Sequence, residues 1–137
     1  LRTMTIDPAK YIDFVSQTTS RPSTYFQDLA TRLAELEGLG ADVPKLTTAA
    51  LGITAEAGEF AEIVKKIFLQ GKPYEEANIV HMKKELGDIM WYMAQACMAL
   101  DTDFDELMQM NVDKLSARYP SGTFDIHYSE NRKEGDL

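Results

Sequence analysis

The sequence predicts an all-α protein, specifically an antiparallel bundle of about five helices. Apolar residues recur at spacings of three and four along almost the whole chain, which is the period of an amphipathic helix. Strict alternation of apolar and polar residues, the pattern of a half-buried strand, occurs only over the short segment 124–128. Capping residues and turns that contain glycine or proline separate the helical segments. We therefore expect helices joined by turns rather than a sheet.

Two helices are predicted in the first 40 residues. The dipeptide Asp7-Pro8 starts the first one, because Asp is a good N-cap and Pro fits the first helical position. The second helix covers about residues 24–37, and its leucines fall on one side. Gly38 and Gly40 follow it, and we expect them to end it.

The two longest helices are predicted over about residues 44–69 and 74–100. Each is roughly 25 residues long, or about 38 Å at the helical rise per residue, and each has a continuous apolar stripe. Gly71 and Pro73 interrupt the helical pattern between them. Because the connection is so short, the two helices should pack antiparallel.

A fifth helix is predicted from about Asp103 to the turn that begins at Tyr119. Glu106 follows Asp103 by three residues, which is close to a capping box. The polar segment 129–137 is expected to fray. Residues 1–3 precede the first methionine, and we interpret them as a cloning remnant outside the fold. The 137 residues should then form a single domain.

The composition restricts the class of function. The chain has 14 Lys and Arg against 22 Asp and Glu, a net charge of −8, which argues against gripping nucleic acid or an anionic membrane. Its one cysteine, Cys97, cannot form an internal disulfide. No apolar run approaches the roughly 20 residues of a membrane span, and the start lacks the apolar segment of a signal peptide. We therefore expect a soluble, cytoplasmic domain with no nucleic-acid or membrane partner.

Two pairs of acidic residues border the apolar stripes of the two long helices. At about 100° per residue, Glu56 and Glu59 fall side by side on one shoulder of the first stripe. Glu85 and Asp88 occupy a shoulder of the second stripe, whereas Glu62 falls on the solvent side. In antiparallel neighbours such pairs can converge, and they would repel each other without a compensating cation. An all-oxygen site suits Mg²⁺ or Mn²⁺ better than Zn²⁺, and bound Mg²⁺ commonly contacts substrate phosphates.

A solvated acidic face is the alternative interpretation, since the same spacings occur on ordinary surface helices. Gly58 and Gly87 lie beside the two acidic pairs, and each costs about 1 kcal/mol relative to Ala inside a helix. These glycines suggest the close approach of a ligand or of another helix. Close helix packing alone accounts for them equally well.

A polar and basic strip on the fifth helix could complement the carboxylates. Asn111, Lys114 and Arg118 share one helix face, and a triphosphate needs cations beyond the metal. An ordinary exposed face is the alternative. Lys66 and Lys72 lie near the end of the first long helix, where they could reach phosphate or only solubilise the turn.

Aromatic and imidazole side chains flank the second acidic pair. Tyr92 follows Asp88 by four residues and lies on the acidic shoulder, where it could contact a base or a sugar, or pack at the core edge. Trp91 falls nearer the opposite shoulder, and we expect it in the core or at an interface. His81 precedes Glu85 by four residues, and we favour a surface role for it over a ligand role.

The acidic pairs stand in the segments Ala55–Glu59 and Glu85–Tyr92, which read AEAGE and ELGDIMWY. Together they resemble the motif of MazG-like all-α nucleoside triphosphate pyrophosphohydrolases of the short phage and bacterial type, E-E-x-x-E, a spacer, then E-x-x-D. The stretch from Asn111 to Pro120 is similar to the substrate-binding segment of that family. The resemblance covers about residues 44–124. It has one departure, because Ala55 stands where the family has its first Glu.

The resemblance implies Mg²⁺-dependent hydrolysis of a nucleoside or deoxynucleoside triphosphate to a monophosphate and pyrophosphate, with Mn²⁺ as a substitute metal. It implies that Glu59 acts in catalysis by orienting or deprotonating the attacking water. Family members are dimers or dimers of dimers, so a homodimer or homotetramer is expected. The metal ligands implied are Glu56, Glu59, Glu85 and Asp88. The substrate-binding residues implied are Lys66, Lys72, Tyr92, Asn111, Lys114, Arg118 and Tyr119.

Three other functions fit parts of the sequence. A dimeric all-α dUTPase-type enzyme shares the acidic pairs, the metal and the bond cleaved, but no uracil pocket is marked here. A catalytically inactive helical interaction module would account for Ala55. A di-iron protein is disfavoured, because no Glu-x-x-His accompanies the carboxylates. For the substrate we favour a deoxynucleotide, and among bases a purine.

Overall fold

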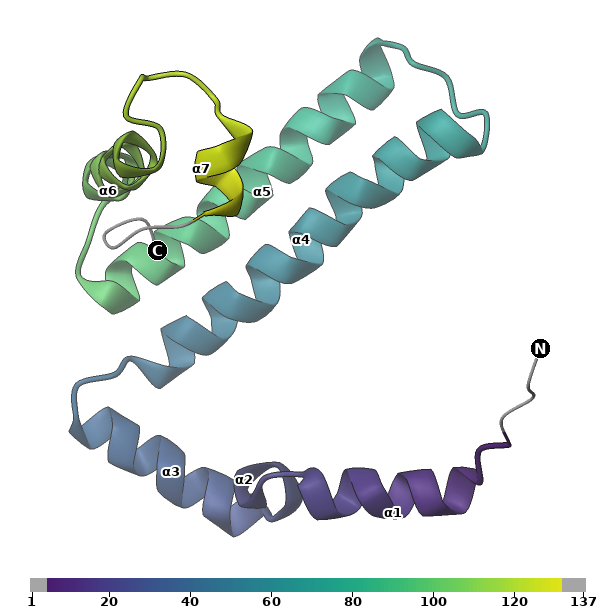
Figure 1. The fold of residues 1–137 in the computed structure, drawn as a ribbon, viewed down its shortest axis with the longest axis vertical. Helices are drawn as coiled ribbons and strands as arrows, with labels where there is room; N and C mark the ends of the chain where they lie inside the picture. Colours follow the sequence, from purple (N-terminus) through teal and green to yellow (C-terminus); the bar gives the residue numbers. More distant parts are fainter. Residues whose placement is uncertain (1–4, 132–137) are drawn as a thin grey trace. The chain divides into compact units, whose positions relative to one another are not determined.

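The structure, a computed structural model, describes residues 5–131 and contains only helices in that range (Figure 1). This confirms the predicted all-α class. The chain divides into two compact units, one ending at Val43 and the other beginning at Pro44. The prediction that the whole chain acts as one domain stays a prediction. The helices are α1 (Pro8–Thr18), α2 (Arg21–Thr24), α3 (Phe26–Gly38), α4 (Val43–Leu69), α5 (Glu76–Leu100), α6 (Phe104–Arg118) and α7 (Ile126–Glu130).

The first unit starts as the sequence predicts. The side chain of Asp7 caps α1 by accepting a hydrogen bond from the Ala9 backbone N–H at 3.0 Å. The predicted second helix corresponds to α3. The short helix α2, which was not predicted, precedes it, and Tyr25 has an extended backbone between the two. As predicted, α3 ends at Gly38, and the chain turns at Gly40, whose φ of +96° favours glycine.

The second unit is built on α4 and α5, which run antiparallel (Figure 1). The predicted turn is present, with Gly71 at a φ of +76°. The amide group of Asn78 fastens the start of α5 to the turn by donating to the Pro73 carbonyl at 2.6 Å. Helix α5 ends at Asp101, which takes a left-handed conformation. The most buried residues of the two helices are Ala49, Gly52, Ile63 and Cys97.

Helix α6 carries the predicted cap. Asp103 accepts a hydrogen bond from the Glu106 backbone N–H at 2.8 Å, and the Glu106 carboxylate in turn accepts from the Thr102 hydroxyl at 2.8 Å. The Glu106 side chain thus folds back on the cap, as the spacing of Asp103 and Glu106 predicts. Among the described helices, none combines the length and apolar character that crossing a membrane requires.

The candidate strand at residues 124–128 is wrong. This stretch leads into α7, because the Asp125 side chain accepts from the His127 backbone N–H at 2.8 Å and caps a helical turn. Ser129 and Glu130, expected to be part of a fraying tail, belong to α7. The rest of that tail, residues 132–137, and the expected cloning remnant, residues 1–3, lie outside the described residues.

Candidate functional site

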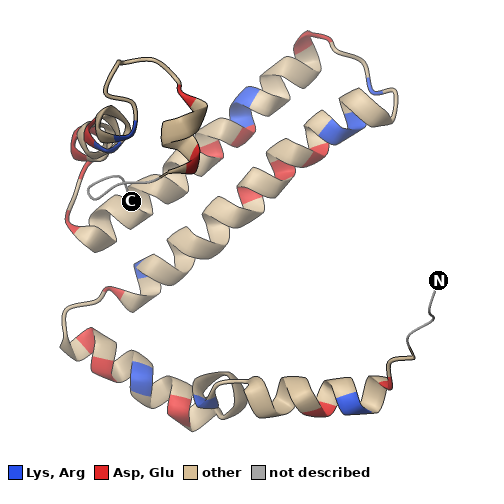
Figure 2. Cartoon of the chain, in the orientation of Figure 1, with Lys and Arg blue, Asp and Glu red and all other residues tan. Residues whose placement is uncertain are grey.

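Helices α4 and α5 bring three of the four predicted metal-binding carboxylates together. One oxygen each from Glu56, Glu85 and Asp88 lies within 4.8 Å of the others. Figure 2 shows acidic residues along the middle of both helices, and lysines toward the α4–α5 turn. The convergence follows from antiparallel packing, since each acidic residue lies on the shoulder of a stripe that faces the neighbouring helix.

The crowding of these carboxylates has an electrostatic consequence. A hydrogen bond shared with Glu85 raises the pKa of Glu56 from 4.5 to about 7, with further contributions from burial and from the charges of Glu85, Asp88 and Glu59. The carboxylate of Glu85 therefore favours the protonated form of Glu56. A divalent cation bound among these oxygens would remove that cost by compensating both charges.

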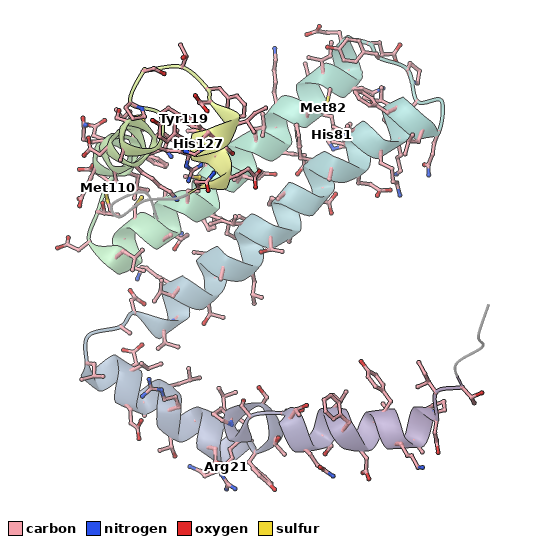
Figure 3. The ribbon with its side chains drawn as sticks, viewed as in Figure 1. Arg21, His81, Met82, Met110, Tyr119 and His127 are labelled. Carbon is pink, nitrogen blue, oxygen red and sulfur yellow. The ribbon has the colours of Figure 1, made fainter. Side chains whose placement is uncertain are left out.

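Glu85 is the most enclosed member of the group. Its side chain is 12% exposed, and its Oε1 atom is paired with His81 Nε2 at 3.2 Å. Its Oε2 atom is buried and, with Glu56 ionised, has no hydrogen-bond donor among the described residues. His81, labelled in Figure 3, is itself 51% exposed, so it does lie at the surface, but it also holds one oxygen of a site residue. A buried carboxylate oxygen without a donor fits a site that binds a cation.

An open cavity adjoins the carboxylates. It has a volume of about 340 Å³, and Glu56, Asp88, Trp91 and Tyr92 line it. The two aromatic rings meet edge to face, with their centroids 5.1 Å apart and their planes at 88°. Trp91 is 58% exposed, so it does not lie in the core, and a place at an interface, the other expectation, stays a prediction. Its place three residues after Asp88 is the signal that could have put it on the acidic face.

The glycines beside the acidic pairs behave differently from expectation. A Cβ atom added at Gly58 or Gly87 would meet nothing within 4 Å in the described chain. The close approach occurs instead at Gly52, where an added Cβ would overlap the Tyr92 ring. Gly52 is four residues before Glu56, so helical spacing could have placed it on the face of the site.

Two other acidic residues of α4 border the cluster. Glu59 is outside the group of three oxygens, although its charge contributes to the raised pKa of Glu56. Glu62 faces solvent as predicted, because it pairs with Lys65 at 3.0 Å and with Lys66 at 3.5 Å, and the Lys65 hydrogen bond lowers its pKa. Lys66 is thus engaged by Glu62 in this structure.

The remaining predicted substrate-binding residues lie on other parts of the second unit. Asn111 and Tyr119 line a second cavity of about 330 Å³ formed by α6 and the segment that follows it. Tyr119, labelled in Figure 3, stacks at an angle on Phe124 with centroids 5.5 Å apart. Lys114 and Arg118 lie on the same helix. Neither these four residues nor Lys72, at the α4–α5 turn, is among the described residues that line the acidic cavity.

Comparison with known proteins agrees with the motif. Residues 45–123 match the family described as the MazG nucleotide pyrophosphohydrolase domain. The matched range contains α5, α6 and nearly all of α4, and therefore every carboxylate of the cluster. The chain is also 39% identical, over 79 residues, to the Gene 37 protein of Mycobacterium phage L5, covering 56% of this chain and 68% of that protein. No solved structure matches the chain.

Proposed function

The chain belongs to the MazG nucleotide pyrophosphohydrolase domain family, and from this premise we propose that it hydrolyses a nucleoside or deoxynucleoside triphosphate to a monophosphate and pyrophosphate. The observation that carries the proposal is the convergence of Glu56, Glu85 and Asp88 beside a cavity, inside the matched domain. Carboxylates that served only to bind a structural metal ion would not need an adjoining cavity with aromatic walls.

The donor set favours Mg²⁺, with Mn²⁺ as a substitute. Three carboxylates within 4.8 Å, one of them with a buried oxygen that lacks a donor, form an all-oxygen site of the kind these ions prefer. When bound, the metal supplies charge compensation for the triphosphate and makes a nearby water more acidic. Glu56, Glu85 and Asp88 would hold it, and Glu59 is the fourth ligand that we propose.

Three further residues of this chain are assigned to the attacking water and to the departing phosphates. Glu59, exposed beside the cluster, orients or deprotonates the water that attacks the α-phosphorus, and pyrophosphate leaves on the opposite side. Lys114 and Arg118 stabilise the charge that accumulates on the departing phosphates. Ala55 has no carboxylate, so this chain offers one metal ligand fewer than the family motif. That is compatible with a smaller number of bound metal ions.

The nucleoside part of the substrate would lie against the aromatic side of the cavity. Tyr92 is half-buried and shares the cavity with Glu56 and Asp88, so it is placed to contact a base or a sugar next to the triphosphate. Four further residues are proposed to contact the substrate from the α4–α5 turn and from α6. They are Lys66, Lys72, Asn111 and Tyr119.

We further propose that the protein is a homodimer or homotetramer. A cavity of about 440 Å³ on the surface of α4 is walled by apolar side chains that include Phe60, Val64, Phe68 and Leu69. Phe68 and Leu69 are 77% and 80% exposed. A contiguous apolar surface of this kind is typical of a subunit contact.

Product analysis on a panel of nucleotides tests the function. Each of the eight common NTPs and dNTPs is incubated with the protein and Mg²⁺, with EDTA as the control. Monophosphate and pyrophosphate from a subset, abolished by EDTA, are expected and would identify the base. Turnover of dUTP alone, added to the panel, would instead indicate a dUTPase-type enzyme. Absence of turnover with both Mg²⁺ and Mn²⁺ would contradict the proposal and favour an inactive interaction module.

A further inference from the structure

A glycine of α4 and a tyrosine of α5 face each other one helical turn away from the carboxylates. Gly52 precedes Glu56 by four residues on α4, and Tyr92 follows Asp88 by four residues on α5. Residues four apart share a helix face, and α4 and α5 run antiparallel. The contact between Glu56 and Asp88 is therefore continued, one turn along, by the contact between Gly52 and Tyr92.

The Gly52 contact is unusually close. Among the glycines of residues 5–131, only Gly52 would bring an added Cβ within 4 Å of other atoms, and that Cβ would overlap three carbons of the Tyr92 ring. Gly52 is also one of the few buried residues of α4. The ring of Tyr92 thus lies directly on the α4 backbone. A single methyl group at position 52 would force the Tyr92 ring to turn away from this place.

The ring is supported on a second side. Trp91 meets it edge to face at a centroid distance of 5.1 Å. The ring, held between the Gly52 backbone and Trp91, forms one wall of the cavity of about 340 Å³ that also contains Glu56 and Asp88. Its position relative to the carboxylates is therefore set by packing.

We propose that Gly52 is a positioning residue that acts through Tyr92, by seating the ring where the nucleoside part of the substrate packs against it. The inference rests on the function proposed above. It assigns part of the recognition of the nucleoside to a contact between α4 and α5, in addition to any contacts that loops make with the nucleoside. It also explains why a residue with no side chain stands in the middle of a long helix, where glycine is unfavourable.

Two alanine substitutions in the same helix test the inference. Gly52→Ala should raise KM for the preferred nucleotide about tenfold, the scale of a lost aromatic contact with a base. Its kcat should stay within about twofold, because the carboxylates are not moved. Gly58→Ala is the matched control: it adds the same methyl group to α4, but in open space, and should leave KM unchanged. Mn²⁺ binding, measured by electron paramagnetic resonance without nucleotide, should be equal in both variants.

Variants of Tyr92 test the inference even if Gly52→Ala does not fold. Tyr92→Ala keeps the glycine and removes the ring, so it should show the same rise in KM. Tyr92→Phe keeps the ring and should raise KM less than Tyr92→Ala does. Equal KM values for Gly52→Ala and Gly58→Ala, or an unchanged KM in Tyr92→Ala, would overturn the inference while the proposed function stands. If the unchanged protein hydrolyses no nucleotide, the proposed function fails first and the inference fails with it.

Discussion

At the scale of single residues, the acidic side chains of α4 and α5 differ in what they face. Asp88→Asn should abolish turnover, because Asp88 is one of the three carboxylates that converge within 4.8 Å. Glu59→Gln should also abolish it if Glu59 activates the water. Circular dichroism should show both variants folded, and nucleotide hydrolysis is the measurement. Near-normal activity in either variant would contradict the role proposed for that residue.

Glu62 offers the control for these two substitutions. It lies on the same helix and carries the same charge as Glu59, but it pairs with Lys65 and Lys66 toward solvent. Glu62→Gln should therefore leave kcat and KM close to their original values, because exposed ion pairs contribute little to stability. A loss of activity in this variant would mean that the metal-binding face of α4 has been placed wrongly.

The raised pKa of Glu56 predicts how the metal-free protein responds to pH. A carboxyl group whose pKa is about 7 in the folded state and 4.5 ordinarily stabilises the fold at low pH, and that contribution is lost as pH rises through 7. In EDTA, the melting temperature of the unchanged protein should therefore fall between about pH 4.5 and pH 7, relative to that of Glu56→Gln. The comparison with Glu56→Gln isolates the contribution of Glu56. Parallel pH profiles of the two proteins would contradict the prediction.

At the scale of helices, caps and turn glycines made most of the secondary structure predictable. Gly71 ends the α4 segment and Asp103 caps α6, because the backbone at these positions needs those residue types. The extended backbone of Tyr25, which divides α2 from α3, has no comparable sequence signal. The segment 124–128 has the alternation of a strand, but a local side-chain cap at Asp125 outweighs it in a segment with no partner strand.

The cap of α6 gives a prediction at this scale. Asp103→Ala should lower the free energy of unfolding by about 1 kcal/mol, since it removes the acceptor for the Glu106 backbone N–H. Asp103→Asn is the matched control, because the Asn side chain can accept the same bond and should restore most of the loss. Urea denaturation of the three proteins measures the difference. Equal losses in both variants would indicate that charge, rather than the cap, is the source of the stabilisation.

The candidate site was predictable in its acidic part and less so in its aromatic part. Helical periodicity alone puts Glu56, Glu85 and Asp88 on facing shoulders, and the structure brings them together. Trp91 and Gly52 were not predicted as parts of the site, because a helical wheel gives the angle of a residue but not the packing between two helices. Contacts of that kind depend on the crossing of two helices, which spacing within one helix does not determine.

At the scale of the whole molecule, the exposed apolar face of α4 predicts association between copies of the chain. Light scattering after size exclusion should show a dimer or tetramer at micromolar concentration. Phe68→Asp should shift the protein toward monomer, because Phe68 is 77% exposed and lines the apolar cavity on α4. Lys83→Ala, on α5, is the control for charge: it changes the net charge by the same −1 at an exposed position outside that cavity and should leave the assembly intact. A monomeric unchanged protein, or a Phe68→Asp variant that still associates, would contradict an assembly through this face.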